Sequence, residues 1–189
     1  SEMCIRDNFY LTAKTITATV AKETFALLEK NGYRAKTIQI TAKEKLCPCD
    51  EMECNPVTCP YAKGHFDRVN DAVFDLLHRC EMIERDDILS QADRYTVCPF
   101  ELCLDTASWC DNVICDYNYV FDPNVYLKRF FQEGIKGDYI FLIDEAHNMV
   151  ERSRQMYSAQ IYKEDFLTVK RIMKEHSRSI AVSYTHLTL

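Results

Sequence analysis

The chain has 189 residues, 47% of them hydrophobic and 28% charged, which is typical of a globular domain and excludes a disordered or fibrous protein. No apolar run is long enough to cross a bilayer and no signal peptide is recognisable, so we expect a cytoplasmic protein without a membrane partner. The formal net charge of −6 argues against a dedicated nucleic-acid module, whose surface is usually basic, and leaves such contacts to local patches.

The start of the chain has the pattern of a strand–helix–strand unit. Phe9–Thr12 is a short apolar stretch typical of a buried strand, and Thr37–Thr41 alternates as a second strand does. Between them, Thr17 or Thr19 can cap a helix that runs to about Lys30 and ends at an Asn-Gly pair. This order and these lengths predict a βαβ unit and therefore a parallel sheet.

The next segment interrupts this pattern. Lys43–Lys63 contains three prolines and four cysteines and has no periodicity, which predicts a loop that carries ligands. Three helices are predicted after it, over Phe66–Cys80, over Asp86–Tyr95 and from Cys98 to about Trp109, with the tryptophan in the core. The apolar face of the first helix is expected to comprise Phe66, Val69, Val73, Leu76 and Leu77.

The sheet is expected to resume with a strand at Asn112–Cys115. A helix is predicted from the Asp122-Pro123 pair to Phe131, with proline at its first position. Tyr139–Ile143 is a continuous apolar run, which predicts a strand buried on both faces of a parallel sheet. Helices are predicted over Val150–Tyr157 and Glu164–His176, and we base nothing on the final SYTHLTL. The sequence thus predicts an α/β fold whose parallel sheet is interrupted by a mostly helical, cysteine-rich insertion.

Two acids follow the last predicted strand directly, in the order Asp144-Glu145-Ala146-His147. In open α/β sheets, ligands lie just beyond the carboxyl ends of the strands, so these acids would face a bound metal–nucleotide. An Asp there can hold Mg²⁺ through water, and the adjacent Glu can activate the attacking water. The pattern is that of a Walker B box of the helicase kind. The alternative is an ordinary polar loop after a core strand.

No phosphate-binding loop accompanies this box. Such a loop needs GxxxxGK[ST], and the chain has only 4 glycines. Gly32–Thr37 resembles the end of the motif, but its spacing is wrong and Ala35 replaces the required glycine. We therefore expect the chain to be a fragment whose phosphate-binding loop lies upstream, and to be inactive alone.

The ten cysteines indicate metal or cluster ligands and not disulfides, because no secretory signal accompanies them. Five are candidates for a four-ligand site: Cys47, Cys49, Cys54, Cys59 and Cys98. Their spacing leaves a [4Fe–4S] cluster and a zinc ion about equally favoured. The remaining cysteines are expected to be small core residues, namely Cys4, Cys80, Cys103, Cys110 and Cys115.

Four stretches together resemble the XPD/DinG-type iron–sulfur DNA helicases of superfamily 2. Tyr10–Thr15 (YLTAKT) looks like motif Ia, and Cys98–Leu102 (CPFEL) looks like the signature of the fourth cluster ligand. Asn112–Pro123 (NVICDYNYVFDP) resembles the return from the cluster insertion to the sheet, and Phe141–Asn148 (FLIDEAHN) resembles motif II. The similarity extends from Phe9 to about His176.

The resemblance implies a partial RecA-like motor domain with a [4Fe–4S] insertion. The implied ligands are Cys47, Cys54, Cys59 and Cys98, although Cys49 could replace Cys54. The implied domains are 1–42 and 111–156 for the motor, 43–110 for the cluster insertion and 157–189 for the start of a truncated arch-like insertion.

The implied activity is ATP- and Mg²⁺-dependent 5′–3′ translocation of a monomer on single-stranded DNA and unwinding of forked DNA, in repair or replication. Asp144 would position Mg²⁺ through water, Glu145 would activate water, and His147 would couple the nucleotide site to DNA or to a second motor domain. A histidine that merely bonds backbone at a helix start is the simpler alternative for His147.

Several polar residues are expected to contact the DNA backbone, because hydroxyls and cations bind phosphate oxygens without reading sequence. They are Thr12, Lys14 and Thr15 of motif Ia, Lys43 and Lys45 beside the cysteines, with Lys63 and Arg68, and Asn118. Ordinary solvated charge is the alternative for the basic residues. Tyr117 and Tyr119 either stack on bases or pack at a strand end. Two other functions stay open: a non-catalytic, metal-stabilised binding module, and a zinc-stabilised scaffold with a decayed motor.

Overall fold

The computed structural model describes residues 7–13, 15–135, 137–159 and 162–176, without the side chains of residues 15–17 and 173–176. It divides into two compact units, residues 1–156 and 157–189, which we describe separately. The predictions for Cys4, Lys14 and the last residues therefore lie outside the described residues, as do those for the side chains of Thr15 and Thr17.

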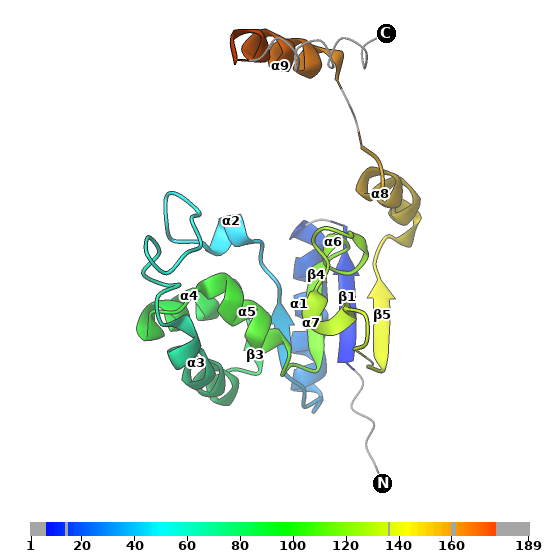
Figure 1. Cartoon of the computed structure of the whole chain (residues 1–189). Coiled ribbons are helices and arrows are strands. Elements are labelled where there is room, and N and C mark those ends of the chain that lie inside the picture. Colours follow the sequence, from blue (N-terminus) through cyan, green and yellow to red (C-terminus); the bar gives the residue numbers. More distant parts are fainter. Residues whose placement is uncertain (1–6, 14, 136, 160–161, 177–189) are drawn as a thin grey trace. The chain divides into compact units, whose positions relative to one another are not determined.

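The first unit is built on a sheet of five parallel strands in the order β3-β2-β4-β1-β5 (Figure 1). The strands are β1 (Asp7–Thr12), β2 (Thr37–Gln39), β3 (Met82–Ile83), β4 (Asn112–Asp116) and β5 (Tyr139–Ile143). This topology confirms the predicted α/β class and fits a partial RecA-like domain. The short β3 comes from the predicted insertion, so the insertion adds a strand to the sheet.

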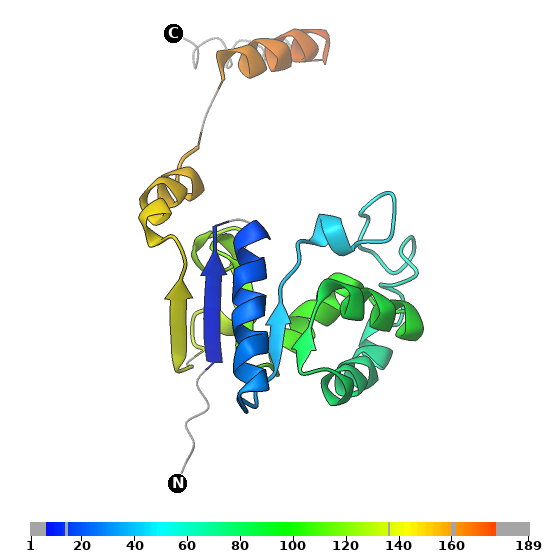
Figure 2. The ribbon, with the colours of Figure 1, turned by 180° about the vertical axis from the view of Figure 1, so that it is seen from behind.

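Helices cover both faces of the sheet and extend beyond one edge (Figures 1 and 2). α1 covers one face, α6 and α7 lie over the other, and α3, α4 and α5 form a group beside β3. The helices of this unit are α1 (Thr15–Lys30), α2 (Lys43–Leu46), α3 (His65–Arg79), α4 (Arg85–Tyr95), α5 (Pro99–Ala107), α6 (Asn118–Phe121), α7 (Lys128–Phe131) and α8 (Met149–Met156), with the 3₁₀ turn η1 (Ala146–Asn148). The described part of the second unit contains α9 (Lys163–His176).

The two cores follow from the alternation of side chains along the strands. On one face Phe9, Leu11 and Val113 are fully buried in a large cluster with residues of α3, α4, α5 and α7. On the other face Ile114 packs with Ala18, Ala21 and Phe25 of α1. The insertion helices therefore share the main core with the sheet.

The apolar face of α3 is partly as predicted. Val69, Val73 and Leu76 are buried, and Leu77 is half-buried. Phe66, however, is 86% exposed, because His65 takes the inward position in the first turn. The placement of Phe66 in the core was wrong. Trp109, 71% exposed after the end of α5, was also wrongly placed there.

Two further predictions are corrected by local structure. The helix expected from Asp122 to Phe131 is interrupted: Asp122 Oδ1 accepts a hydrogen bond from the Asn124 N–H at 2.8 Å, which fixes a turn between α6 and α7. β5 is not buried on both faces. Residues 140–143 are 37–47% exposed, because β5 is the edge strand and pairs with β1 alone among the described strands.

The burial pattern of α3 predicts unequal costs for two truncations on the same helix. Leu76→Ala should lower the free energy of unfolding by about 2–5 kcal/mol, because Leu76 is fully buried and leaves a cavity. Phe66→Ala is the control and should cost less than about 1 kcal/mol. Urea denaturation measures both, and equal losses would contradict the packing of α3.

Candidate functional site

The parallel register brings three strand ends to one edge of the sheet. Thr12 at the end of β1 pairs with Asp116 at the end of β4. Leu11 pairs with Ile143, and the Leu11 carbonyl accepts a hydrogen bond from the Asp144 N–H at 3.0 Å. The DEAH residues therefore begin beside Leu11 and Thr12, at the end of β1.

The acidic box itself is half-exposed or exposed and has one unusual backbone conformation. Glu145 lies in the left-handed region, with φ 49° and ψ 45°, a conformation that is uncommon for a residue other than glycine. Its carboxylate Oε2 lies 3.2 Å from Nδ1 of His147. Both side chains are open to solvent, so a ligand could reach them from outside the sheet.

A buried tyrosine holds the box against β4. The Tyr117 ring is fully buried and its hydroxyl donates to the backbone carbonyl of Asp144. Burial raises the pKa of Tyr117, and the charges of Asp144, Glu145 and Asp116 act in the same direction. The hydroxyl thus keeps its proton as a donor at neutral pH. Of the two roles expected for Tyr117, the structure shows packing at the strand end.

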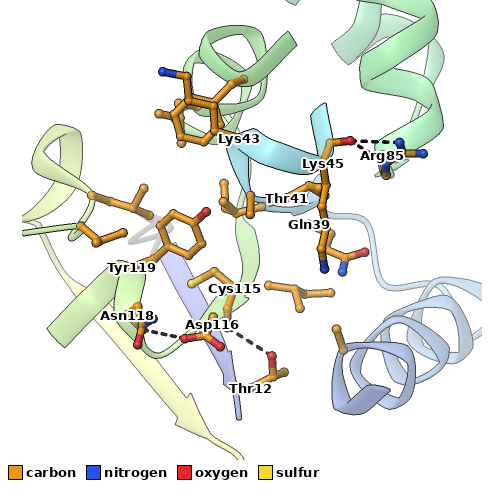
Figure 3. A pocket seen from close by; sticks show the side chains of 18 of the residues that line it. Thr12, Gln39, Thr41, Lys43, Lys45, Arg85, Cys115, Asp116, Asn118 and Tyr119 are labelled. Atoms are coloured by element: carbon orange, nitrogen blue, oxygen red, sulfur yellow. Dashed lines mark hydrogen bonds between the residues drawn. The ribbon is translucent and has the colours of Figure 1, made fainter. Parts of the chain in front are cut away.

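A cavity of about 850 Å³ opens at the same edge, between the ends of β1, β2 and β4 and the helices α2 and α5 (Figure 3). Four of the predicted DNA-contacting residues line it: Thr12, Lys43, Lys45 and Asn118. Thr12 is only 3% exposed and its hydroxyl lies 3.5 Å from the Cys115 carbonyl, so this side chain mainly packs. Lys45 is exposed, and Lys43 and Asn118 are half-buried.

The lining of this cavity is mixed in charge. Its basic residues are Lys22, Lys43, Lys45, Arg85, Lys128 and Arg129, and its acidic residues are Glu44, Glu84, Asp86 and Asp116. Lys22 pairs with Glu84 at 3.0 Å and Arg85 with Asp86 at 3.3 Å. Lys45 and Lys128 form no ion pair with any described residue, so they leave positive charge for an anionic ligand.

The candidate cysteine ligands gather around α2 and the start of α5. Cys47 follows α2 and Cys98 precedes α5. The sulfurs of Cys49 and Cys59 lie 4.0 Å apart. Burial, and then the neighbouring sulfurs of Cys59 and Cys47, raises the pKa of the Cys49 thiol to about 11.

Lys43 lies beside the remaining candidates. A hydrogen bond with Cys54 raises the pKa of the Lys43 ammonium above its ordinary value, although burial acts in the opposite direction. Charge on Cys54, Cys98 and Cys47 adds to this rise. Lys43 therefore belongs both to the cavity lining and to the surroundings of the cysteines.

The free thiols of the candidate cysteines fit a group that is held by thiolates. Within the described residues no three histidine, cysteine, aspartate or glutamate side chains converge as a metal site. A tetrahedral zinc with Zn–S bonds of about 2.3 Å would separate its sulfurs by roughly 3.8 Å, close to the distance between Cys49 and Cys59. This distance keeps Cys49 a candidate ligand beside Cys59.

Three other cysteines are core residues, as predicted. Cys103, Cys110 and Cys115 are buried, and burial raises the pKa of the first two thiols to about 12. These three side chains belong to the main hydrophobic core, so their role is packing. Cys80 is half-buried and packs against the main core.

Comparison with known proteins identifies the family. The DEAD_2 family model matches residues 12–166, which is most of the chain. The chain belongs to the DEAD_2 family. Similar relatives are the Fanconi anemia group J protein homolog of Gallus gallus, 29% identical over 76 residues, and the general transcription and DNA repair factor IIH helicase subunit XPD/RAD3 of Saccharomyces cerevisiae, 31% identical over 108 residues. These matches confirm the resemblance to the XPD/DinG-type helicases.

The matched regions are small parts of these relatives. They cover 40% and 57% of this chain but only 6% and 13% of the two relatives, respectively. The DEAD_2 chain thus corresponds to a short part of much longer proteins. None of the helices in its described part has the length and apolar character needed to span a membrane.

Two residues of this DEAD_2 chain support the cysteine region in ways that its sequence did not indicate. Arg68, expected to contact DNA or to be an ordinary solvated charge, donates to the carbonyls of Lys63, Tyr95 and Thr96 at 2.6–2.8 Å and so ties the cysteine loop to the end of α4. The buried His65 accepts a hydrogen bond from the Cys98 N–H at 3.2 Å. Because these partners lie 5 to 33 positions away, neither periodicity nor motif spacing signals the contacts.

Gly64 makes this arrangement of Arg68 possible. It precedes α3 with φ +65°, a conformation that favours glycine. A Cβ atom at this position would lie 2.7 Å from Nη1 of Arg68.

The buried hydroxyl of Tyr117 provides a test of how the DEAH segment is held. Tyr117→Phe should lower the free energy of unfolding by about 1–3 kcal/mol, because the Asp144 carbonyl loses its donor. The matched control, Tyr126→Phe, should change it by less than about 0.5 kcal/mol. Denaturant titration followed by tryptophan fluorescence measures both. An unaffected Tyr117→Phe variant would rule out this hydrogen bond as a contact that holds the DEAH segment.

Proposed function

We propose that the chain is part of the first motor domain of an ATP-dependent DNA helicase that translocates 5′ to 3′ on single-stranded DNA and unwinds forked duplexes. The observation that supports this most is the shared sheet edge, where the DEAH residues lie next to the end of β1 and where Thr12, at that end, lines the cavity with Lys43, Lys45 and Asn118. The yeast relative is named as a helicase subunit of a DNA repair factor, which favours the same class and a role in repair or replication.

Each residue of the DEAH box has a proposed role. Asp144 would hold Mg²⁺ through water, and the ion would neutralise the phosphate charge of ATP. Glu145, whose side chain is exposed, would orient and deprotonate the attacking water. His147, whose Nδ1 lies 3.2 Å from the Glu145 carboxylate, would couple the nucleotide site to bound DNA or to a second motor domain.

Single-stranded DNA would lie along the cavity and the segment after β1. Lys43, Lys45 and Asn118 supply a cationic and hydrogen-bonding wall that suits phosphate oxygens in any sequence. Lys14 and Thr15 would extend this contact. The buried Thr12 would support it by packing at the end of β1. The negative charge of the whole chain does not oppose this, because binding depends on the local wall.

A [4Fe–4S] cluster would stabilise the segment that precedes α3. Cys47, Cys59 and Cys98 would hold it together with Cys54, or with Cys49 in its place. Residues 47–63 contain no helix or strand, so a cluster would fix a loop that has few apolar contacts of its own. The proposed domains are 1–42 and 111–156 for the motor, 43–110 for the cluster insertion and 157–189 for the start of an arch, in a monomeric cytoplasmic enzyme.

The catalytic role predicts the behaviour of Glu145→Gln in the full-length protein. ATP turnover should fall at least 100-fold, because the general base is lost, while ATP and single-stranded DNA should still bind. A coupled ATPase assay and fluorescence anisotropy measure these quantities, with Glu151→Gln on α8 as the control. Wild-type protein that binds DNA without ATP turnover would instead favour the non-catalytic binding module.

The cluster proposal predicts that Cys98 and Cys80 behave differently. Cys98→Ser should lose most of the iron and destabilise the insertion, whereas Cys80→Ser, in a half-buried core position, should keep its iron. Iron and sulfide are measured after anaerobic purification of both full-length variants. Equal iron loss in the two variants would refute the ligand assignment.

A further inference from the structure

We propose that Arg152 of α8 is a positioning residue that couples the DEAH box to the segment following β1, through its ion pair with Asp116. This inference rests on the proposed helicase function and extends it. The coupling would run through a set of contacts between three separate parts of the chain. These contacts join the DEAH box, which is proposed to bind the nucleotide, to the segment after β1, which is proposed to bind DNA.

One nitrogen atom of Arg152 contacts two separate segments of the chain. Nη2 of Arg152 lies 3.2 Å from the Ala13 carbonyl and 3.3 Å from Oδ2 of Asp116, and it donates to both. α8 begins at Met149, directly after the η1 turn that contains His147. A side chain just beyond the DEAH box therefore reaches the backbone of the motif Ia segment.

Asp116 lies between the cavity and Arg152. Its carboxylate lines the cavity, and its Oδ1 accepts a hydrogen bond from the Asn118 N–H at 2.9 Å (Figure 3). Oδ2 accepts from Arg152, so each oxygen has a described partner. The pair also compensates a negative charge that would otherwise repel phosphates from this wall. Arg152 thus connects to Ala13 and, through Asp116, to Asn118.

Asp116 at the end of β4 and Tyr117 directly after it contact the two ends of the DEAH segment. Tyr117 bonds the carbonyl of Asp144 at the start of the box, and Asp116 pairs with Arg152 after its end. Consecutive residues at the end of β4 therefore bracket the box. If nucleotide binding shifts residues 144–148, the Arg152 side chain must move or lose a partner, and either change reaches Ala13.

The pair of Arg152 and Asp116 side chains is not one of the contacts that hold the sheet together. The ladder between β1 and β4 ends at the pair of Thr12 and Asp116, so the Ala13 carbonyl lies beyond it. The Arg152 and Asp116 side chains are 32% and 34% exposed, which leaves the pair outside the main core. Losing it should release Ala13 and leave the strands paired.

The experiment measures ATP turnover of the full-length protein with and without a single-stranded oligothymidine. Arg152→Ala should reduce the stimulation by DNA about tenfold, a typical coupling between two sites, and leave turnover without DNA within about twofold. Asp116→Arg should show a similar loss. Arg152→Lys, which keeps a cationic N–H donor for the Ala13 carbonyl and for Asp116, should retain most of the stimulation. Arg154→Ala, on the same helix but 73% exposed, is the control and should behave as wild type.

The outcomes distinguish this inference from the function on which it rests. Wild-type protein whose ATP turnover does not respond to DNA would overturn the proposed helicase function and the coupling with it. A stimulated wild type together with a fully stimulated Arg152→Ala variant would overturn the coupling alone. Parallel loss of basal and stimulated turnover in both Arg152→Ala and Arg152→Lys would reduce Arg152 to a structural role and also overturn the coupling.

Discussion

The parallel pairing of β1 between β4 and β5 is the constraint on which the rest of the molecule depends. Phe9 and Leu11 of β1 are fully buried, and Phe9 packs against the rings of Phe130, Phe131 and Tyr139 with centroid distances of 5.1–5.6 Å. This register leaves the motif Ia segment, the end of β4 and the DEAH box at one edge. A slip by one residue would turn the inward side chains of β1 outward and separate the three strand ends.

The insertion depends on the same core and on a small number of arginine contacts. Arg129 of α7 pairs with Glu101 at 2.7 Å and with Asp105, both on α5, so the segment after Cys98 is fixed to the sheet side of the molecule. Arg68 fixes the other end of the cysteine region through three carbonyls. The cysteine loop is thus held between two anchored segments, and this arrangement would allow its ligands to be ordered without a core of their own.

The sequence predicted what depends on local pattern and failed where distant contacts decide. Strands at Phe9–Thr12 and Asn112–Cys115 were evident from their apolar runs, and the DEAH residues from their order after a third run. The exposure of β5 could not be predicted, because an apolar run gives no information about which strands flank it. The hydrogen bond of Tyr117 and the contacts of Arg152 could not be predicted for a similar reason, since the partners lie 27 and 36 positions away.

The cysteine region is the place where a single measurement separates the competing accounts most directly. The measurement is the content of iron, acid-labile sulfide and zinc per chain after anaerobic purification, together with the visible absorption spectrum. We predict about four irons and four sulfides, the content of one [4Fe–4S] cluster. One zinc without iron would contradict this account, and the cysteines would then form a structural zinc site on a DEAH-box motor.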